Sequence, residues 1–250
     1  MPRTITILNW NTQIASPRTR GARFEAIRQT IAQYDADIIC LTEAYPETMP
    51  SGGHTITGGL SVWGNYEKHG ARKVVLWSRS GWEQVDALGS DRLPEGRFVS
   101  GLTIIEDAAL CIAGMCIPYH DYRNREKWGD QRRQRWQGAC DYLDALRESV
   151  LPQSRYRQRT VLLGDFNLQI PPYNYPRPSE PVNHKREVTF AGWHIPTSGD
   201  LDDPALDKRF IDHVALTDDI TVTSMRFISR FDANGSNLSD HNGVFITLTM

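Results

Sequence analysis

The sequence predicts an α/β protein, and two patterns of apolar residues support this fold class. Short segments rich in Val, Ile, Leu and Thr recur along the chain, as is typical of buried β-strands. Two longer segments place apolar residues at steps of three and four, which is the spacing of an amphipathic helix. Each helical segment lies between two strands, and such alternation of strand, helix and strand is typical of α/β folds.

The predicted elements follow one another along the whole chain. The expected strands are residues 4–10, 37–41, 74–78, 98–105, 110–117, 160–163, 210–217, 220–227 and 243–249. The apolar stripes of the two expected helices are Phe24, Ile27, Ile31 and Tyr34, and Trp136, Ala139, Cys140, Leu143, Leu146 and Val150. Proline-containing residues 46–59 and 171–185 are expected to be long surface loops, either functional or passive. No linker-like tract divides the pattern, so residues 1–250 are predicted to form a single domain.

Composition excludes several classes of protein. Of the 250 residues, 40% are hydrophobic and 23% are charged, as in ordinary globular proteins, which excludes wholesale disorder. Lys and Arg number 28 against 30 for Asp and Glu, so the formal charge is -2. This excludes a histone-like basic protein but not a local basic patch. No apolar run approaches the roughly 18 residues needed to span a bilayer, and neither a secretion leader nor membrane association is expected.

The four cysteines indicate a reducing compartment. Cys40, Cys111, Cys116 and Cys140 all lie within apolar strand or helix patterns, and no pair has the spacing of a zinc site or a redox motif. They are therefore expected to be buried free thiols. A cytoplasmic location follows as an expectation.

Acids, amides and one histidine stand next to the ends of several predicted strands, or within one, where ordinary apolar or turn residues would be expected. These residues are Asn9, Asn11, Glu43, Asp165, Asn167, Asp212, Asp240 and His241. Residues two apart on an extended chain share a face, so Asp165 and Asn167 should point together while Phe166 turns away. Strand ends at one edge of a sheet lie close in space, and oxygen-bearing side chains suit a hard cation such as Mg²⁺ or Mn²⁺.

Each of these residues also has a purely structural interpretation. Gly164-Asp165-Phe166-Asn167 alone is compatible with a β-turn, and Glu43 alone with an edge charge. Asp212 is harder to explain in this way, because an unpaired carboxylate inside an apolar strand is costly. His213 should face away from Asp212 and is expected to be structural.

The ordered set of motifs resembles a known family. The motifs are Trp10-Asn11, Ile39-Cys40-Leu41-Thr42-Glu43, Gly164-Asp165-Phe166-Asn167, Ile211-Asp212-His213 and Ser239-Asp240-His241. Together they resemble the endonuclease/exonuclease/phosphatase superfamily, which includes pancreatic deoxyribonuclease and apurinic-site endonucleases. The resemblance implies a four-layer α/β sandwich, two β-sheets packed face to face with helices outside, and a divalent metal at one edge.

The resemblance also implies a role for each motif residue in the attack of water on phosphorus. Glu43 is the expected Mg²⁺ ligand, with Asn11 beside it and Asp240 as a further ligand or a support. Asp165 is expected to orient or deprotonate the water, and Asn167 to stabilise the transition state. His241 is expected to contact the scissile phosphate.

Two further histidine-related expectations complete the set. Asp212 should hold His241 and favour its charged form. His120, in Pro118-Tyr119-His120-Asp121, lies where many family members carry a second catalytic histidine, although a plain loop histidine is the alternative. Two departures, Thr42 and Asn242-Gly243, weaken assignment to one subfamily but remove no expected ligand.

Basic residues near the expected site favour a polyanionic substrate. Arg123 and Arg125 begin a basic stretch just beyond His120, and aromatic residues interleave with it. Such residues can contact phosphates and stack on bases, although a solvated helix face explains them equally well. The leading hypothesis is a metal-dependent phosphodiesterase acting on nucleic acid, either an endonuclease or an exonuclease. The alternatives are a phosphatase or phosphodiesterase acting on a nucleotide or inositol phosphate, and a catalytically silent binding module.

Overall fold

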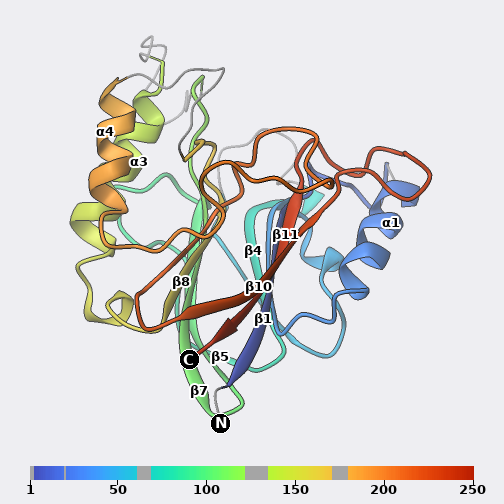
Figure 1. The fold of residues 1–250 in the computed structure, drawn as a ribbon, viewed down its shortest axis with the longest axis horizontal. Helices are drawn as coiled ribbons and strands as arrows, with labels where there is room; N and C mark the ends of the chain where they lie inside the picture. The colour runs from blue at the N-terminus through green and yellow to red at the C-terminus, as the bar shows by residue number, and fades with distance from the viewer. Residues whose placement is uncertain (1–2, 20, 61–68, 122–134, 171–179) are drawn as a thin grey trace.

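A computed structural model describes residues 3–19, 21–60, 69–121, 135–170 and 180–250 (Figure 1). Arg123 and Arg125, the predicted substrate-binding residues, lie outside these ranges. Among the described residues, no helix is long and apolar enough to cross a membrane.

The first sheet has six strands and contains both the first and the last strand of the chain. Its order is β10 (Thr221–Ile228), β11 (Gly243–Thr249), β1 (Thr4–Asn11), β2 (Ile38–Ala44), β4 (Arg72–Ser78) and β3 (His54–Thr57). Only β1 and β2 pair in parallel, so both strands end at the same edge. The connection between them is α1 (Gly21–Ala32), as expected from the apolar stripe at Phe24, Ile27 and Ile31.

The second sheet has five strands, in the order β5 (Trp82–Asp86), β6 (Phe98–Ile105), β7 (Ala108–Cys116), β8 (Thr160–Asp165) and β9 (Val214–Leu216). Here β7 and β8 are parallel and the other neighbours are antiparallel. The connection between β7 and β8 includes α3 (Gln137–Ala145), which continues into a wider helical turn, η3 (Leu146–Val150).

Alternation along the strands produces the layers. In β1, Ile5 and Ile7 pack between the two sheets, whereas Leu8 and Trp10 pack towards α1. The second sheet in the same way covers the central core on one face and packs against α3 and α4 (Glu180–Thr189) on the other. Figure 1 shows α1 on one flank and α3 and α4 on the opposite flank. The predicted four-layer α/β sandwich is therefore confirmed.

Four local predictions were wrong or incomplete. Residues 46–59 are not one loop, because they contain η1 (Pro46–Thr48) and the short edge strand β3. The edge strand β5 was missed, since its exposed charged residues lack an apolar pattern. Residues 180–185 belong to α4, where Pro181 sits in the first turn and blocks no helical hydrogen bond. The strand at residues 210–217 begins only at Val214, so Asp212 precedes it.

All four cysteines are buried and free, as expected. Burial raises the pKa of each thiol, which keeps the sulfur protonated and unreactive at neutral pH.

His213 is a structural residue, as expected. Its Nε2 lies 3.0 Å from the carbonyl oxygen of Leu168, which can only accept, so Nε2 carries the proton. Its Nδ1 then accepts from the Thr197 hydroxyl at 3.1 Å. Burial lowers the pKa of His213 to about 4, so the imidazole is neutral in the folded protein.

We expect His213 to make the protein less stable in mild acid. In the unfolded chain the His213 imidazole becomes protonated below its ordinary pKa of 6.5. In the folded chain it stays neutral down to about pH 4. This histidine therefore removes about 3 kcal/mol of unfolding free energy between pH 6.5 and pH 4. Urea titrations at pH 7 and pH 5 measure the effect. His213→Gln should flatten this part of the pH dependence, whereas replacing the exposed His54 by Gln should not. Equal slopes in all three proteins would contradict the assignment.

Candidate active site

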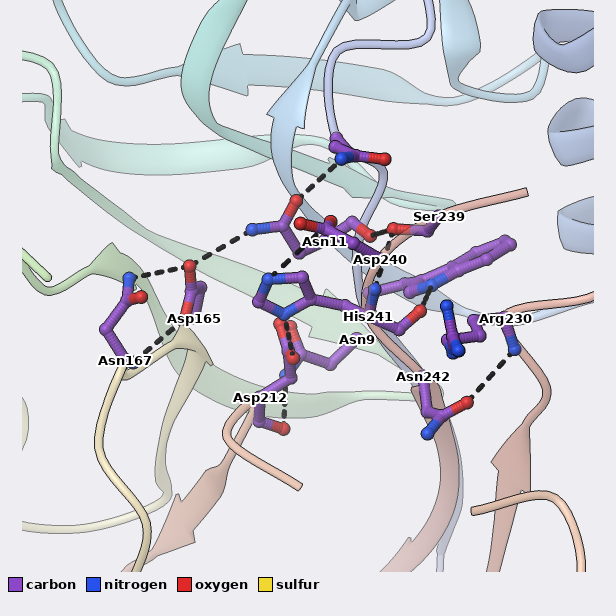
Figure 2. A network of polar contacts seen from close by, with 12 residues as sticks. Asn9, Asn11, Asp165, Asn167, Asp212, Arg230, Ser239, Asp240, His241 and Asn242 are labelled. Atoms are coloured by element: carbon purple, nitrogen blue, oxygen red, sulfur yellow. Dashed lines mark hydrogen bonds and ion pairs between the residues drawn. The ribbon is translucent and has the colours of Figure 1, made fainter. Parts of the chain in front are cut away.

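Most of the sequence-predicted polar residues meet at one edge of the two sheets, and Figure 2 shows Asn11, Asp165, Asn167, Asp212, Asp240 and His241 gathered there. Asn11 and Glu43 lie at the ends of the parallel pair β1 and β2, and Asp165 ends β8. Asp212 and His241 lie on the segments that enter β9 and β11. Parallel pairing places strand ends from distant parts of the sequence side by side, which explains the convergence.

Asp165, Asp212 and His241 form the centre of the site. One ligand atom from each lies within 4.8 Å of the other two. Asp165 and Asp212 are only 2% and 1% exposed. Nδ1 of His241 lies 2.6 Å from Oδ2 of Asp212, so this carboxylate fixes the orientation of the imidazole.

Two amides hold the Asp165 carboxylate. Nδ2 of Asn11 donates to Oδ2 at 3.0 Å, and Nδ2 of Asn167 donates to the same oxygen at 2.7 Å. The backbone N–H of Asn167 donates to Oδ1 at 2.8 Å. Asn167 has a φ of 51°, a conformation that asparagine tolerates well, and this tight turn brings its side chain back beside Asp165. Phe166 points into the core, as predicted.

Gly164 allows β8 to approach β7 closely enough to place Asp165. Its φ is 135°, and a Cβ atom there would lie 1.9 Å from the carbonyl oxygen of Met115. No other residue fits this position without moving the strand.

Asn9 ties the first sheet to the second directly beneath the site. Its buried Nδ2 lies 2.9 Å from the carbonyl oxygen of Asp212, 3.4 Å from that of Gly164 and 3.3 Å from that of His213. The sequence pattern singled out Asn9, but not this bridging role.

Ser239 and Trp10 fix the segment that carries His241. The Ser239 hydroxyl donates to the carbonyl oxygen of Asn11 at 2.6 Å and accepts from the His241 backbone N–H at 3.1 Å. Nε1 of Trp10 donates to the carbonyl oxygen of His241 at 2.8 Å. In the Trp-Asn and Ser-Asp-His motifs, Trp10 and Ser239 therefore have a structural role, because they position the segment of His241.

Glu43 lies outside the three-residue cluster and pairs with Lys73. Nζ of Lys73 lies 2.7 Å from Oε1 of Glu43, and the lysine side chain is only 4% exposed. A φ of 51° at Glu43 interrupts the β2–β4 pairing between Thr42 and Ala44. Sequence analysis missed Lys73, although a lysine at the start of the apolar run Val74–Leu76 was the available signal.

The remaining predicted residues lie at the margin of the site. Oδ1 of Asp240 is 3.8 Å from Nε2 of His241. In the described part of the chain, His120 contacts Asp121 at 3.0 Å and the rings of Tyr119 and Trp136 rather than the central cluster. His120 lies four residues after the end of β7. Ile117, the first residue after β7, accepts a hydrogen bond from Asn167 through its carbonyl oxygen.

A family model described as the Endonuclease/Exonuclease/phosphatase family matches residues 8–241. The chain belongs to the endonuclease/exonuclease/phosphatase family. Among curated protein sequences, no relative matches the chain.

Solved structures of low sequence identity share the fold. An AP endonuclease from Archaeoglobus fulgidus has a TM-score of 0.68 at 15% identity, with 97% of this chain and 98% of that chain covered. D. rerio TDP2, humanized by 14 mutations, has a TM-score of 0.67 at 14% identity, covering 99% of each chain. The Neisseria 3' phosphatase NExo has a TM-score of 0.63 at 18% identity, covering 97% and 98%.

The centre of the site places one histidine, His241, beside two buried carboxylates, Asp165 and Asp212. Burial alone would lower the pKa of His241, but the carboxylate of Asp212, helped by Asp165 and Asp240, raises it to about 10. His241 is therefore an imidazolium at neutral pH. Burial raises the pKa of Asp165 to about 7 against the opposing charge of His241, and Asp212 and Glu43 add to the rise.

Oxygen donors at this edge of the sheets suit the hard divalent cation that the family implies, and Asp165, Asp212 and His241 are the described residues that lie close enough together to hold one. Oδ1 of Asp212 and Oδ1 of Asp240 are shielded from solvent and have no hydrogen-bond partner among the described residues. Oδ1 of Asn11 accepts one hydrogen bond, from the Gln13 backbone, and keeps a second lone pair. Lys73 occupies Oε1 of Glu43, so Oε2 is the atom that this residue would offer. A donor set made of oxygens suits Mg²⁺ better than a thiolate-preferring metal.

We expect Asp212→Asn to lower the pKa of His241 by more than one unit. The variant removes the negative charge nearest to the imidazole but leaves the burial that disfavours its charged form. Titration of the imidazole ¹⁵N resonances measures this pKa. Asp240→Asn is the matched control and should give a smaller shift, because Asp240 lies farther away. An unchanged pKa in Asp212→Asn would disprove the pairing.

Proposed function

We propose that the chain is a divalent-metal-dependent phosphoester hydrolase, and specifically a phosphodiesterase acting on nucleic acid. One observation carries the proposal. A buried carboxylate, Asp165, is held by two amides beside an imidazolium, His241, that is itself held by Asp212. This arrangement offers a base for water and a cation for phosphate in one place.

Asp165 acts as the base. Its pKa of about 7 matches the requirement that a general base both accept and release a proton near neutral pH. Water loses a proton to Asp165 as its oxygen bonds to phosphorus, and the P–O bond to the leaving group breaks. The leaving oxygen then takes up a proton from solvent and Asp165 releases its proton to solvent, which yields an alcohol and a phosphate monoester.

His241 binds the phosphoryl oxygens, and Asn167 joins it by releasing one of the two hydrogen bonds that its Nδ2 makes, to Asp165 and to Ile117. The imidazolium supplies a positive charge and an N–H donor where negative charge builds up in the transition state. Asp212 is a positioning residue that keeps His241 charged and oriented. His120 is proposed as a further contact to phosphate from the segment after β7.

Glu43 and Asn11, with Asp240 beside them, are the proposed ligands of Mg²⁺, with Mn²⁺ as the alternative ion. When bound there, the ion would polarise a phosphoryl oxygen. Lys73 holds Glu43 in place and balances its charge inside the protein.

Three observations support nucleic acid as the substrate. A cavity of about 300 Å³ lies along the segments that follow Asn167 and flank Asp212, and Lys208, Arg209 and Phe210 in its lining offer cations and an aromatic ring. Its lining also contains Asp200 and Asp207, of which Asp207 is paired with Arg230. The Neisseria 3' phosphatase was solved with a product DNA hairpin, and a D. rerio TDP2 with a single-strand DNA product. Arg123 and Arg125 are proposed as additional phosphate contacts.

Two alternatives remain part of the test. The 3' phosphatase among the similar structures favours a monoesterase as second candidate. A protein that only binds its ligand does not require a carboxylate that accepts a proton beside a charged histidine, as Asp165 and His241 offer. A reducing compartment such as the cytoplasm is also proposed, because the four thiols are free.

We expect the protein to hydrolyse DNA, RNA or bis(p-nitrophenyl) phosphate with Mg²⁺, and none of them with a chelator. Asp165→Asn should lower the rate at least about 10²-fold, because only the proton-accepting group changes. Asp107→Asn on the β6–β7 turn is the matched control and should keep the wild-type rate. A preference for p-nitrophenyl phosphate would favour the monoesterase. Inactivity of the wild type on every substrate would favour the binding module.

We expect Glu43→Gln to weaken Mg²⁺ or Mn²⁺ binding by about tenfold or more, since a neutral amide replaces the anionic ligand. Calorimetry with Mn²⁺ measures the affinity directly, and added Mg²⁺ should partly restore the rate. Glu47→Gln, at an exposed position four residues away, should bind metal like the wild type. If excess Mg²⁺ restores nothing and the Mn²⁺ affinity is unchanged, the ligand assignment is wrong.

A further inference from the structure

A second cavity adjoins the site on the side of the first sheet. It has a volume of about 440 Å³, within the range in which proteins hold small ligands. Its walls include Gln13, Ile14, Arg18, Tyr45 and His69. Gln13 lies two residues after the proposed ligand Asn11, and Tyr45 lies two residues after the proposed ligand Glu43. The cavity is therefore close to the proposed metal ligands along both segments.

The floor of this cavity is held rigidly. Gln13 and Ile14 have φ values of 48° and 51°, which is unusual for two consecutive residues other than glycine and especially for a β-branched one. Hydrogen bonds maintain this conformation: Ile14 N donates to the Glu43 carbonyl at 2.7 Å, and the Arg23 guanidinium donates to the Gln13 carbonyl at 3.0 Å. Strained backbone that is held in this way is typical of ligand-binding segments.

The walls have the chemistry of a nucleotide site. Nη1 of Arg18 lies 3.4 Å from Nδ1 of His69, and both residues are exposed. Among the described residues that line the cavity, none is acidic. The partly buried side chain of Ile14 supplies apolar surface in the same cavity, and Tyr45, which is buried in the core, closes its inner wall. A ligand that suits both parts has an anionic group beside a flat apolar one.

We propose that this cavity binds the nucleotide next to the scissile phosphate of a single-stranded nucleic acid, with Arg18 contacting its phosphate and Ile14 contacting its base. The inference rests on the proposed function, because it places the scissile phosphate at Asp165 and His241. The cavity lined by Lys208, Arg209 and Phe210 then receives the other side of the substrate. A substrate with a group on each side of its phosphorus is a diester, so the two cavities favour a phosphodiester over a monoester.

The test measures the binding of a short fluorescein-labelled single-stranded DNA by anisotropy, in chelator so that no cleavage occurs. Arg18→Ala should raise Kd about tenfold and lower the slope of log Kd against log salt concentration by about 0.7, because one phosphate contact is lost. Thr19→Trp, which fills the cavity without removing a charge, should raise Kd similarly and keep the slope. Arg28→Ala on α1 is the matched control for charge and should change Kd less than about twofold.

Each outcome decides the question. Wild-type affinity in both Arg18→Ala and Thr19→Trp, no DNA binding by the wild type, or equal weakening in Arg28→Ala would overturn the nucleotide site. If the expected binding pattern appears but the wild type hydrolyses no phosphoester with Mg²⁺, the site stands and the proposed hydrolase function fails. If hydrolysis is observed but the binding pattern is absent, only the nucleotide site fails.

Discussion

The relative position of the two sheets at the site depends on hydrogen bonds that join β1 to segments of the second sheet. Asn9 binds three backbone carbonyls beside Asp165 and Asp212, and Asn11 binds the Asp165 carboxylate itself. Apolar packing is not directional, so by itself it specifies the relative position of two sheets less sharply than hydrogen bonds do. Directional bonds from two amides on one face of β1 remove that freedom where the carboxylates must meet the histidine.

The site concentrates charge that a protein interior normally excludes. Asp165, Asp212 and Glu43 would be costly to bury alone, but His241 and Lys73 lie beside them and reduce the cost. The arrangement is nevertheless unfavourable for Asp165, whose raised pKa records that its charge is opposed. Carboxylates with raised pKa values cluster at functional sites in proteins.

Much of the fold and the centre of the site could be predicted from the sequence, because both depend on local patterns. Apolar alternation placed β1, β6 and β11, and the acids and amides at strand ends pointed to Asp165 and Asn167. Edge strands β3 and β5 were missed because one exposed face leaves little apolar pattern. The Glu43–Lys73 pair depends on the register between β2 and β4 and on a positive φ, neither of which local composition reveals. The Arg18–His69 contact joins loops 51 residues apart and has no local signal at all.

The position of β1 has a consequence for how the fold forms. β1 lies between β2 and β11, and the segment before β11 carries His241 and the Ser239 hydroxyl that holds Asn11. β1 pairs with β11 from Thr4–Thr249 to Asn9–Val244, so this pairing closes a loop that contains almost all of the described residues. Closing so long a loop costs chain entropy before any contact offsets it, so β1 and β11 are expected to pair late in folding. His241 therefore reaches Asp165 and Asp212 only when the two ends of the described fold have come together.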